Sequence, residues 1–219
     1  MKIVFATQNR SKLKEASEIL GPGFELVTPA DLGITEEIPE TGETLQENSL
    51  QKAMYIYERT GEACFSDDSG LEVDALGGAP GVHTARYAGP SRSADANIDK
   101  LLRELEIAGQ AGNDGQGVGA CCGSGAAVTP DLIGGLRTAR FHTFATLILP
   151  GPDIHQFEGI MPGRIARERS GRGGFGYDPI FIPDEADGRT AAELTDEEKN
   201  AISHRGRALR ALAKYLSTI

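Results

Sequence analysis

Residues 2–27 read KIVFATQNRSKLKEASEILGPGFELV, and this stretch decides the fold class. Lys2 to Ala6 is an apolar run of strand length that leads into a polar turn. Apolar residues from Leu13 to Leu20 then recur at helical spacing, and Gly21-Pro22-Gly23 ends the predicted helix. Phe24 to Val27 predicts a second strand. A strand, a helix and a strand in this order favour an α/β fold with a partly parallel sheet.

The rest of the chain continues with both kinds of element. Helices are predicted over residues 44–59 and 94–105, and a last helix, which carries Ile202 to Leu216, begins at a capping box in 195–198. Strands are predicted over 141–149 and 156–160, joined by a turn at 150–153, and 164–167 is expected to add a third strand of an antiparallel meander. At 219 residues the chain suits one domain over 1–219, or two lobes that share a core.

One segment, residues 109–135, differs from the rest because glycine is so frequent in it. Glycine disfavours helix and strand, since the unfolded chain keeps much entropy at each glycine. We therefore interpret 109–135 as a flexible insertion within the domain. It is not a domain boundary, because the strands after it still need the first half of the chain to form a core. A long loop of this kind is either functional or disordered.

Charge and composition narrow the classes of partner. The chain has 22 Lys and Arg against 32 Asp and Glu, a formal net charge of −10. This balance argues against a nucleic-acid backbone or an anionic membrane as partner. No apolar stretch approaches the roughly 20 residues that span a bilayer, and the first apolar run is too short for a signal peptide. Three cysteines give neither a disulfide framework nor zinc spacing, so we expect a cytoplasmic protein.

Residues 63–71 read ACFSDDSGL, an apolar run that leads directly into two adjacent carboxylates. Ala63 to Phe65 predicts a buried strand, and Asp67 and Asp68 are then expected at its end, where α/β sheets form binding crevices. Adjacent acids repel each other and resist desolvation, so their place beside a core strand favours a cation or a proton transfer. A solvated turn is the alternative, because Asp, Ser and Gly all favour turns.

A group of polar residues lies between the first predicted strand and the first predicted helix. Backbone amides at a helix N-terminus, together with Lys12 in the first turn, are typical of an anion site. The alternative is an ordinary helix cap by Asn9 or Ser11. The group consists of Thr7, Gln8, Asn9, Arg10, Ser11 and Lys12.

Carboxylates and a lysine also occur around the second predicted helix. Asn48 and Lys52 are one helical turn apart and share a face, and Glu40 precedes the helix. Mg²⁺ takes one or two carboxylates and fills its octahedron with water and phosphate oxygens. Glu40 and Asp68 would supply those carboxylates if the fold brings them together. A solvated acid or a helix cap is the alternative for Glu40.

Residues 171–179 match the dinucleotide pattern G-x-G-x-x-G in letters only. A true fingerprint follows a strand and opens a helix, whereas this stretch leads into the strand-like residues 180–182, so we reject that interpretation. Glycines around one aromatic residue instead predict a loop that presents Phe175 as a flat face for stacking on a base. The alternative is a hairpin in which Phe175 fills the core.

Near the end of the chain, Lys199 lies one helical turn before Ser203, which His204 and Arg205 follow. His204 and Arg205 offer hydrogen-bond donors suited to carbonyl or phosphate oxygens, and a basic solvated face is the alternative. The patterns of P-loops, of H-E-x-x-H metalloproteases and of G-x-S-x-G hydrolases are absent. Taken together, the lysines, carboxylates, aromatic face and donors suit a nucleoside triphosphate.

These residues belong to motifs that follow one another along almost the whole chain. They are Thr7-x-Asn9-x-x-Lys12, Glu40-Thr41-Gly42-x-Thr44, Glu47-Asn48, Lys52-Ala53, Ser66-Asp67-Asp68-Ser69-Gly70-Leu71, Gly77-Gly78-Ala79-Pro80-Gly81, Ala85-Arg86-Tyr87, Gly173-Gly174-Phe175-Gly176-Tyr177-Asp178-Pro179 and Lys199-x-x-x-Ser203-His204-Arg205. In this order the chain resembles the inosine/xanthosine triphosphate pyrophosphatases. Only the glycine-rich insertion departs from the pattern of that family, and it leaves the motif residues intact.

The resemblance implies an α/β fold in which an elongated mixed sheet with flanking helices forms two lobes around a central nucleotide cleft. It implies a homodimeric, Mg²⁺-dependent house-cleaning hydrolase that converts ITP, dITP and XTP to the monophosphate and pyrophosphate. Glu40 and Asp68 would bind the metal, and Asp68 would be the base for the attacking water. The substrate-binding residues would be Thr7, Gln8, Asn9, Arg10, Ser11, Lys12, Lys52, Ser69, Phe175, Gly176, Tyr177, Asp178, Lys199, His204 and Arg205.

The choice of nucleobase has a physical explanation, and two other functions remain as alternatives to this hydrolase. Donors from His204 and Arg205 would favour hypoxanthine and xanthine, which carry an acceptor oxygen where adenine carries an amine. A non-catalytic nucleotide sensor would keep the pocket, but intact Asp68, Lys12 and Lys52 argue against it. A pyrophosphatase directed at standard or modified pyrimidine nucleotides is the nearer alternative.

Overall fold

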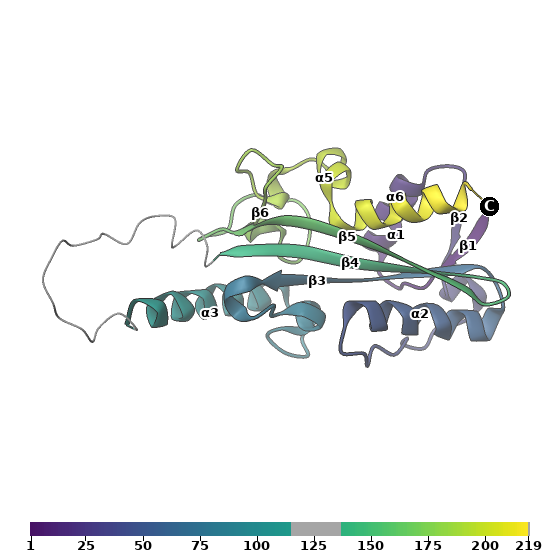
Figure 1. The fold of residues 1–219 in the computed structure, drawn as a ribbon, viewed down its shortest axis with the longest axis horizontal. Helices are drawn as coiled ribbons and strands as arrows, with labels where there is room; N and C mark the ends of the chain where they lie inside the picture. Colours follow the sequence, from purple (N-terminus) through teal and green to yellow (C-terminus); the bar gives the residue numbers. More distant parts are fainter. Residues whose placement is uncertain (115–136, 219) are drawn as a thin grey trace, which may run out of the picture. The chain divides into compact units, whose positions relative to one another are not determined.

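The computed structural model describes residues 1–114 and 137–218, and its strands form one mixed sheet (Figure 1). In this part of the chain, six strands are hydrogen-bonded in the order β2-β1-β3-β4-β5-β6. β1 pairs in parallel with β2 and with β3, while β5 and β6 are antiparallel. The α/β class with a partly parallel sheet is therefore confirmed. The strands are β1 (Lys2–Phe5), β2 (Glu25–Val27), β3 (Cys64–Val73), β4 (Thr138–Leu149), β5 (Asp153–Ile165) and β6 (Phe181–Pro183).

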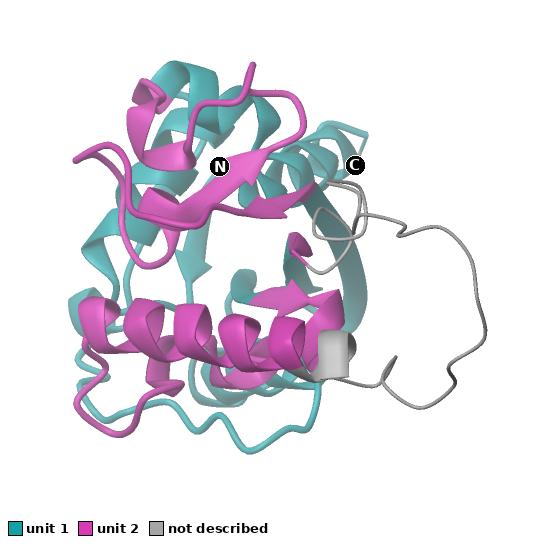
Figure 2. Ribbon diagram, turned by 90° about the vertical axis from the view of Figure 1, so that its left-hand side faces the viewer, with its two compact units in different colours: residues 1–70, 141–161, 197–219 teal, residues 71–140, 162–196 magenta. Residues whose placement is uncertain are grey.

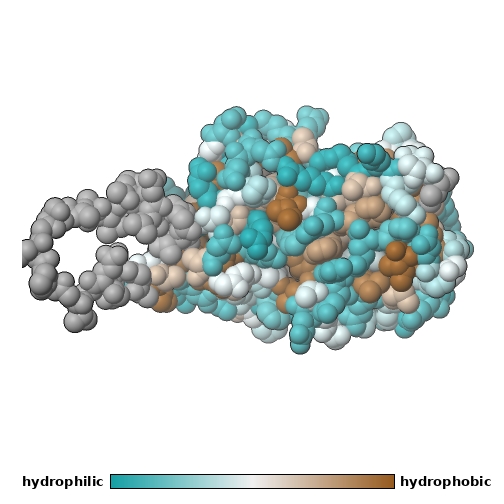
Figure 3. All heavy atoms as spheres, in the orientation of Figure 1, coloured by the Kyte–Doolittle hydropathy of each residue, from teal (hydrophilic) through white to brown (hydrophobic). Residues whose placement is uncertain are grey.

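Three of the helices begin at residues whose side chains satisfy the first backbone amides. Asn9 caps α1, Thr44 forms a capping box with Glu47 at the start of α2, and Ser203 caps α6. None of the helices within residues 1–114 and 137–218 is both long and apolar enough to cross a membrane. On the face drawn in Figure 3, hydrophilic residues are interspersed with apolar ones. The helices are α1 (Arg10–Leu20), α2 (Leu45–Thr60), α3 (Ala94–Asp114), α5 (Asp196–Ile202) and α6 (His204–Leu216), with short 3₁₀ turns η1 (Ala30–Leu32), η2 (Asp74–Leu76), η3 (Gly81–Arg86), η4 (Asp178–Ile180) and η5 (Ala191–Glu193).

The chain divides into two compact units, which Figure 2 draws in teal and magenta. Unit 1 comprises residues 1–70, 141–161 and 197–219, and unit 2 comprises residues 71–140 and 162–196. Strands β3, β4 and β5 therefore each contribute residues to both units. Of the predicted site residues, Phe175 to Asp178 belong to unit 2, and all the others belong to unit 1.

The sheet of unit 1 has helices on both faces, and strand alternation determines which residue meets which helix. Ile3, Phe5 and Phe65 pack against apolar residues of α1 and α6. Their neighbours Val4 and Cys64 point to the other face and pack against apolar residues of α2. Figure 1 shows α1 and α6 on one side of β1 and β3, and α2 on the opposite side. The position of a residue along β3 therefore decides which helices surround it.

Two predicted elements near the end of the chain are wrong. Residues 164–167 do not form a strand of their own, because β5 continues without a break to Ile165, and the third strand is β6. The last helix is two helices, α5 and α6. Ser203 separates them because its backbone is extended (φ −64°, ψ 148°) and its hydroxyl caps α6.

The helix predicted over residues 94–105 continues to Asp114, so residues 109–114 of the predicted insertion are helical. A glycine inside a helix costs only about 1 kcal/mol relative to alanine. Each added residue also gains a hydrogen bond once the helix is nucleated. Since Leu101 and Leu105 anchor the preceding turns in the core, the helix extends past Gly109. Residues 115–135 of the predicted insertion lie outside the described residues.

Candidate active site

Asp67 and Asp68 lie inside β3 and not at its end, because the strand continues to Val73. The expected position at the end of a strand is therefore wrong. A solvated turn is also excluded, since Asp67 is 1% and Asp68 9% exposed. Neighbouring residues of a strand point to opposite faces. Asp67 shares the face of Phe65, which α1 and α6 cover, whereas Asp68 shares the face of Cys64, which α2 covers.

Asp67 is enclosed by cations from two helices. Lys12 Nζ of α1 lies 3.1 Å from Asp67 Oδ1, and Arg205 Nε of α6 donates to Asp67 Oδ2 at 2.9 Å. Arg205 also pairs with Glu15 of α1, and Lys199 Nζ of α5 lies 3.8 Å from Glu15 Oε1. Burial would raise the pKa of Asp67, but Lys12 and Arg205 outweigh it and hold that pKa well below its usual range. We name these five residues the Asp67 cluster.

Asp68 forms a second group, the Asp68 cluster, with Lys52 and Glu40. Lys52 Nζ lies 2.7 Å from Asp68 Oδ1 and 2.7 Å from Glu40 Oε1. Burial raises the pKa of Asp68 above its ordinary value, although Lys52 and Lys12 oppose the shift. Burial would lower the pKa of Lys52, but Asp68 and Glu40 raise it, so Lys52 is an ammonium at neutral pH. Asp68 is thus a carboxylate that accepts a proton more readily than an ordinary aspartate does.

Lys12 differs from Lys52 in its electrostatic surroundings. Burial lowers the pKa of Lys12, and the attraction of Asp67 opposes this shift. Lys52 and Arg205 are close enough to lower the same pKa further. Three cations therefore adjoin one another around the two carboxylates of β3. Across the two clusters four cations are matched by four carboxylates, and the adjoining ammonium groups still offer donors to an anion.

The turn before α1 contains the helix cap that the sequence left as an alternative. Asn9 Oδ1 accepts hydrogen bonds from the backbone amides of Ser11 and Lys12 at 2.9 and 3.3 Å. Thr7 is buried, and its hydroxyl accepts from the Asn9 amide at 3.2 Å. Gln8 Nε2 donates to the carbonyl of Glu36 at 3.1 Å. The exposed residues of the turn are Gln8, Asn9, Arg10 and Ser11.

The residues around the start of α6 are buried, so the alternative of a basic solvated face is wrong. Lys199 is 7% exposed, His204 7% and Arg205 2%. The His204 ring stacks on Phe141 with centroids 4.9 Å apart and an interplanar angle of 13°. Burial, and then Arg205 and Lys199, lower the pKa of His204 well below its ordinary value, so its ring is neutral at pH 7. Within the described residues, His204 Nδ1 is buried without a hydrogen-bond partner.

Two further residues of unit 1 were missed by the sequence analysis. They are Thr143 and Glu15. The Thr143 hydroxyl, from β4, lies 2.6 Å from Ser69 Oγ, which itself lies 3.3 Å from Asp67 Oδ2. Thr143 carried no sequence signal, because its position depends on the pairing of distant strands. Glu15 did carry one, since it lies three residues after Lys12 and therefore on the same helix face.

The loop that holds Phe175 is in unit 2. Phe175 is 42% exposed, which excludes the alternative that it fills the core. Asp178 Oδ2 accepts from the Phe175 amide at 2.7 Å, and the Tyr177 hydroxyl donates to the carbonyl of Thr84 at 3.0 Å. Gly174 has φ +71°, and a Cβ there would overlap the Asp178 carboxylate. The loop continues into η4 and β6 and not into a long helix, which confirms that the dinucleotide interpretation is wrong.

Glu40 and Asp68 fit a small divalent cation. Their oxygens converge on one point, where the Lys52 ammonium lies 2.7 Å from each. Among residues 1–114 and 137–218, no group of three or more His, Cys, Asp or Glu side chains is placed to hold a metal ion. Mg²⁺ needs only one or two carboxylates when phosphate oxygens and water complete its shell. The donor set therefore suits a cation that is shared with a phosphate ligand.

An α/β sheet with two lysine–carboxylate clusters is suited to a protein that binds and acts on phosphate groups. The chain belongs to the Ham1 family, whose sequence model matches residues 3–131 and 126–215. A dITP/XTP pyrophosphatase of Christiangramia forsetii is 42% identical over 217 residues, 99% of this chain and 100% of the relative. One of Bacillus subtilis is 42% identical over 214 residues, 97% of this chain and 96% of the relative. A solved HAM1 protein from Coxiella burnetii has a TM-score of 0.81 at 37% identity, with 100% of both chains covered.

Proposed function

We propose that this chain hydrolyses the purine nucleoside triphosphates ITP, dITP and XTP to the nucleoside monophosphate and pyrophosphate. One observation carries this proposal: β3 places Asp68, a carboxylate of raised pKa, beside the ammonium groups of Lys52 and Lys12. The relatives that match nearly the whole chain are named dITP/XTP pyrophosphatases, which supports this class of substrate. Enzymes of this kind generally depend on a metal ion, and we propose Mg²⁺ held by Glu40 and Asp68.

Binding of the triphosphate is assigned to Lys12, Lys52 and the turn before α1. The two ammonium groups neutralise phosphate oxygens, and the backbone amides at the helix N-terminus favour an anion. The pKa of Lys12 is lowered by burial and by neighbouring cations, so an anion that binds there stabilises its charged form. In this proposal Asp67 keeps Lys12 and Arg205 in place and touches no substrate atom.

Asp68 is the general base of the reaction. It accepts a proton from water, while the water oxygen forms a bond to the α-phosphorus. The bond from the α-phosphorus to its bridging oxygen breaks, and pyrophosphate leaves with that electron pair. A carboxylate of raised pKa accepts the proton more readily, and Lys52, 2.7 Å away, fixes its orientation. Bound Mg²⁺ supplies neutralisation of the phosphate charge.

Selectivity for the base is assigned to His204, Arg205 and Phe175. The neutral His204 ring has one donor and one acceptor nitrogen, and Nδ1 has no partner within the described residues. A base that presents a keto oxygen pairs with a donor, whereas the amine of adenine leaves that donor unpaired. Arg205 is held by its contacts with Asp67 and Glu15. The exposed ring of Phe175 is proposed to stack on the base.

The proposal includes a homodimer that acts in the cytoplasm, as the resemblance implies. Light scattering coupled to size-exclusion chromatography tests the oligomeric state. A dimer gives about twice the 23.2 kDa mass of the chain. A mass near that of one chain would contradict this part of the proposal.

Pyrophosphate release from a panel of nucleotides, with and without Mg²⁺, tests the reaction. We expect release from ITP, dITP and XTP that requires Mg²⁺ and far exceeds release from ATP or CTP. Asp68→Asn serves as the inactive variant, and Asp31→Asn, an exposed aspartate of unit 1, serves as the matched control. Binding of ITP without release would indicate a sensor. Faster release from pyrimidine nucleotides would assign the chain to the other hydrolase class.

A further inference from the structure

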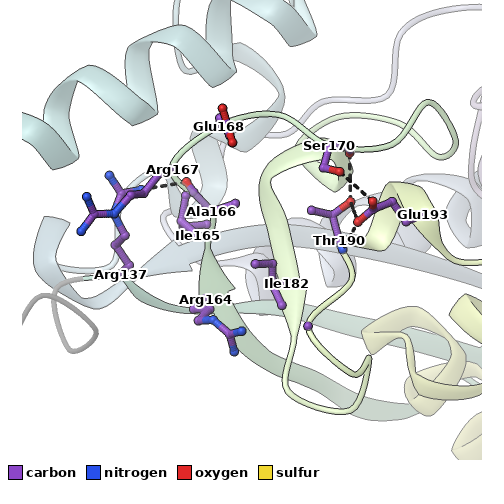
Figure 4. A pocket seen from close by; sticks show the side chains of 11 residues that line it. Arg137, Arg164, Ile165, Ala166, Arg167, Glu168, Ser170, Ile182, Thr190 and Glu193 are labelled. Atoms are coloured by element: carbon purple, nitrogen blue, oxygen red, sulfur yellow. Dashed lines mark hydrogen bonds between the residues drawn. The ribbon is translucent and has the colours of Figure 1, made fainter. Parts of the chain in front are cut away.

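Unit 2 contains a pocket that belongs to neither charged cluster of β3. Its volume is about 560 Å³, and arginine is prominent among the residues that line it (Figure 4). The lining comes from β5, β6, the segments that follow each of them, and Arg137 immediately before β4, and it lies in one compact unit. The lining residues are Arg137, Arg164, Ile165, Ala166, Arg167, Glu168, Ser170, Ile182, Gly188, Thr190 and Glu193.

Arg137 and Arg167 lie side by side because the start of β4 adjoins the end of β5, whereas Arg164 points away from them (Figure 4). The amide of Ile165 donates to the carbonyl of Arg137 at 2.8 Å. Arg137 Nη1 in turn donates to the carbonyl of Ala166 at 2.8 Å, which places Arg137 beside Arg167 (Figure 4). Arg164 lies on β5 opposite Ile182 of β6. These contacts therefore bring Arg137 close to Arg167, although the two residues are far apart in the sequence.

Within the described residues, the guanidinium groups of this pocket form no ion pair, although Glu168 and Glu193 also line it. Burial, and then the like charge of Arg167, lower the pKa of Arg137, while Glu106 opposes the shift. Within residues 1–114 and 137–218, no carboxylate lies within 4.0 Å of Arg137, Arg164 or Arg167. Two like charges kept close together repel each other, and a bound anion removes that repulsion.

Two carboxylates line the pocket: Glu168 is exposed and has no ion pair with the described arginines, and Glu193 is held by hydrogen bonds of its own. Glu193 accepts hydrogen bonds from the hydroxyl of Ser170 at 2.7 Å and from the amide of Thr190 at 2.7 Å. Figure 4 shows these three residues grouped on one side of Ile182, with Arg137 and Arg167 on the other. These neutral donors fix the Glu193 carboxylate within its own turn, so it does not neutralise the arginines.

We propose that this arginine pocket binds a phosphate-bearing small molecule, at a site that shares no lining residue with the one assigned to the substrate. A guanidinium group donates two parallel hydrogen bonds to phosphate oxygens, and arginine stays charged at any physiological pH. A volume of about 560 Å³ is within the range of small-molecule sites. Inorganic pyrophosphate and the phosphate of a nucleotide share the required chemistry. The inference uses none of the residues placed in the reaction, so it stands or falls independently of the proposed function.

Amide spectra of the ¹⁵N-labelled full-length chain, titrated with phosphate, pyrophosphate or inosine monophosphate, test this site. We expect saturable shifts in the amides of residues 164–168. Arg137→Gln combined with Arg167→Gln should weaken this binding at least about tenfold. Arg167→Gln alone should weaken it too, and it keeps the hydrogen bond from Arg137 to Ala166, so folding is not at stake. Arg103→Gln is the matched control, because Arg103 is exposed on α3 in the same unit and does not line the pocket.

The titration separates the two sources of phosphate. Tighter binding of pyrophosphate than of inosine monophosphate identifies the free anion as the ligand, and the reverse order identifies a nucleotide. Shifts confined to residues 7–12 would overturn the inference. So would shifts in residues 164–168 that persist with equal affinity in the arginine variants. Nucleotide hydrolysis is measured separately, and its outcome changes neither result.

Discussion

Asp67→Asn tests the most deeply buried charge of the site. The carboxylate is 1% exposed and lies 3.1 Å from Lys12 Nζ and 2.9 Å from Arg205 Nε. At an effective dielectric constant of about 20, each contact corresponds to about 5 kcal/mol of attraction, much of which offsets desolvation. Removal of one partner from a buried ion pair costs about 3–5 kcal/mol. We expect about 3 kcal/mol here, because Glu15 still pairs with Arg205 in the variant.

The effect of Asp67→Asn should depend on pH in a defined direction. The pKa of Asp67 is lower in the folded protein than in the unfolded chain, so its ionised form favours the fold. Its stabilisation is therefore complete above the unfolded pKa of about 3.9 and is lost as the pH falls toward the folded pKa. The difference in unfolding free energy between the wild type and the variant should be full at pH 7. It should shrink at pH values below about 4.

Urea unfolding followed by circular dichroism at several pH values measures this difference. Asp31→Asn is the control, because Asp31 is exposed and accepts hydrogen bonds only from nearby Thr28. It should change the unfolding free energy far less than Asp67→Asn does. An Asp67→Asn protein within about 0.5 kcal/mol of the wild type at pH 7 would refute the reasoning. Lys12 and Arg205 would then lie close to the Asp67 carboxylate without stabilising the fold.

Three further substitutions test the reaction and the loop of unit 2. Asp68→Asn should abolish turnover, measured by pyrophosphate release, while largely sparing nucleotide binding, measured by calorimetry. Retained activity would show that Asp68 is not the general base. Lys52→Met should move the acidic limb of the kcat/KM profile to higher pH, because Lys52 lowers the pKa of Asp68. If the acidic limb does not shift, it reports the titration of a group other than Asp68. Phe175→Ala should raise KM with little change in Tm, since the ring is 42% exposed; a lower Tm with unchanged KM would make Phe175 a packing residue.

The elements of unit 1 were largely predictable because their signals are local. The strand at Lys2, the glycine that ends α1 and the helix over 44–59 all follow from neighbouring residues. The division of the last helix at Ser203 also has a local cause, but the apolar spacing on both sides concealed it. Local patterns thus identified the elements more reliably than the breaks between them.

The contacts of the site depend on tertiary structure and were out of reach of the sequence pattern. Lys12 meets Asp67 across 55 positions of the chain, and Arg205 meets it across 138. The motifs identified these residues as important without indicating which would touch. Alternation along β3 would have separated Asp67 from Asp68, had the strand been extended past Phe65. The apolar residues at 71 and 73 were the signal for that extension.

Because both carboxylates lie within β3, between β1 and β4 in the sheet, they belong to the framework of unit 1 and not to a loop. Interior strands exchange their amide hydrogens only through the largest opening events of a protein, whereas loops open locally at low cost. We therefore expect the proposed base and its neighbour to open only when the whole of unit 1 opens. On heating, activity should decline together with the cooperative loss of structure and not before it. This enzyme would keep its chemistry for as long as it keeps its fold.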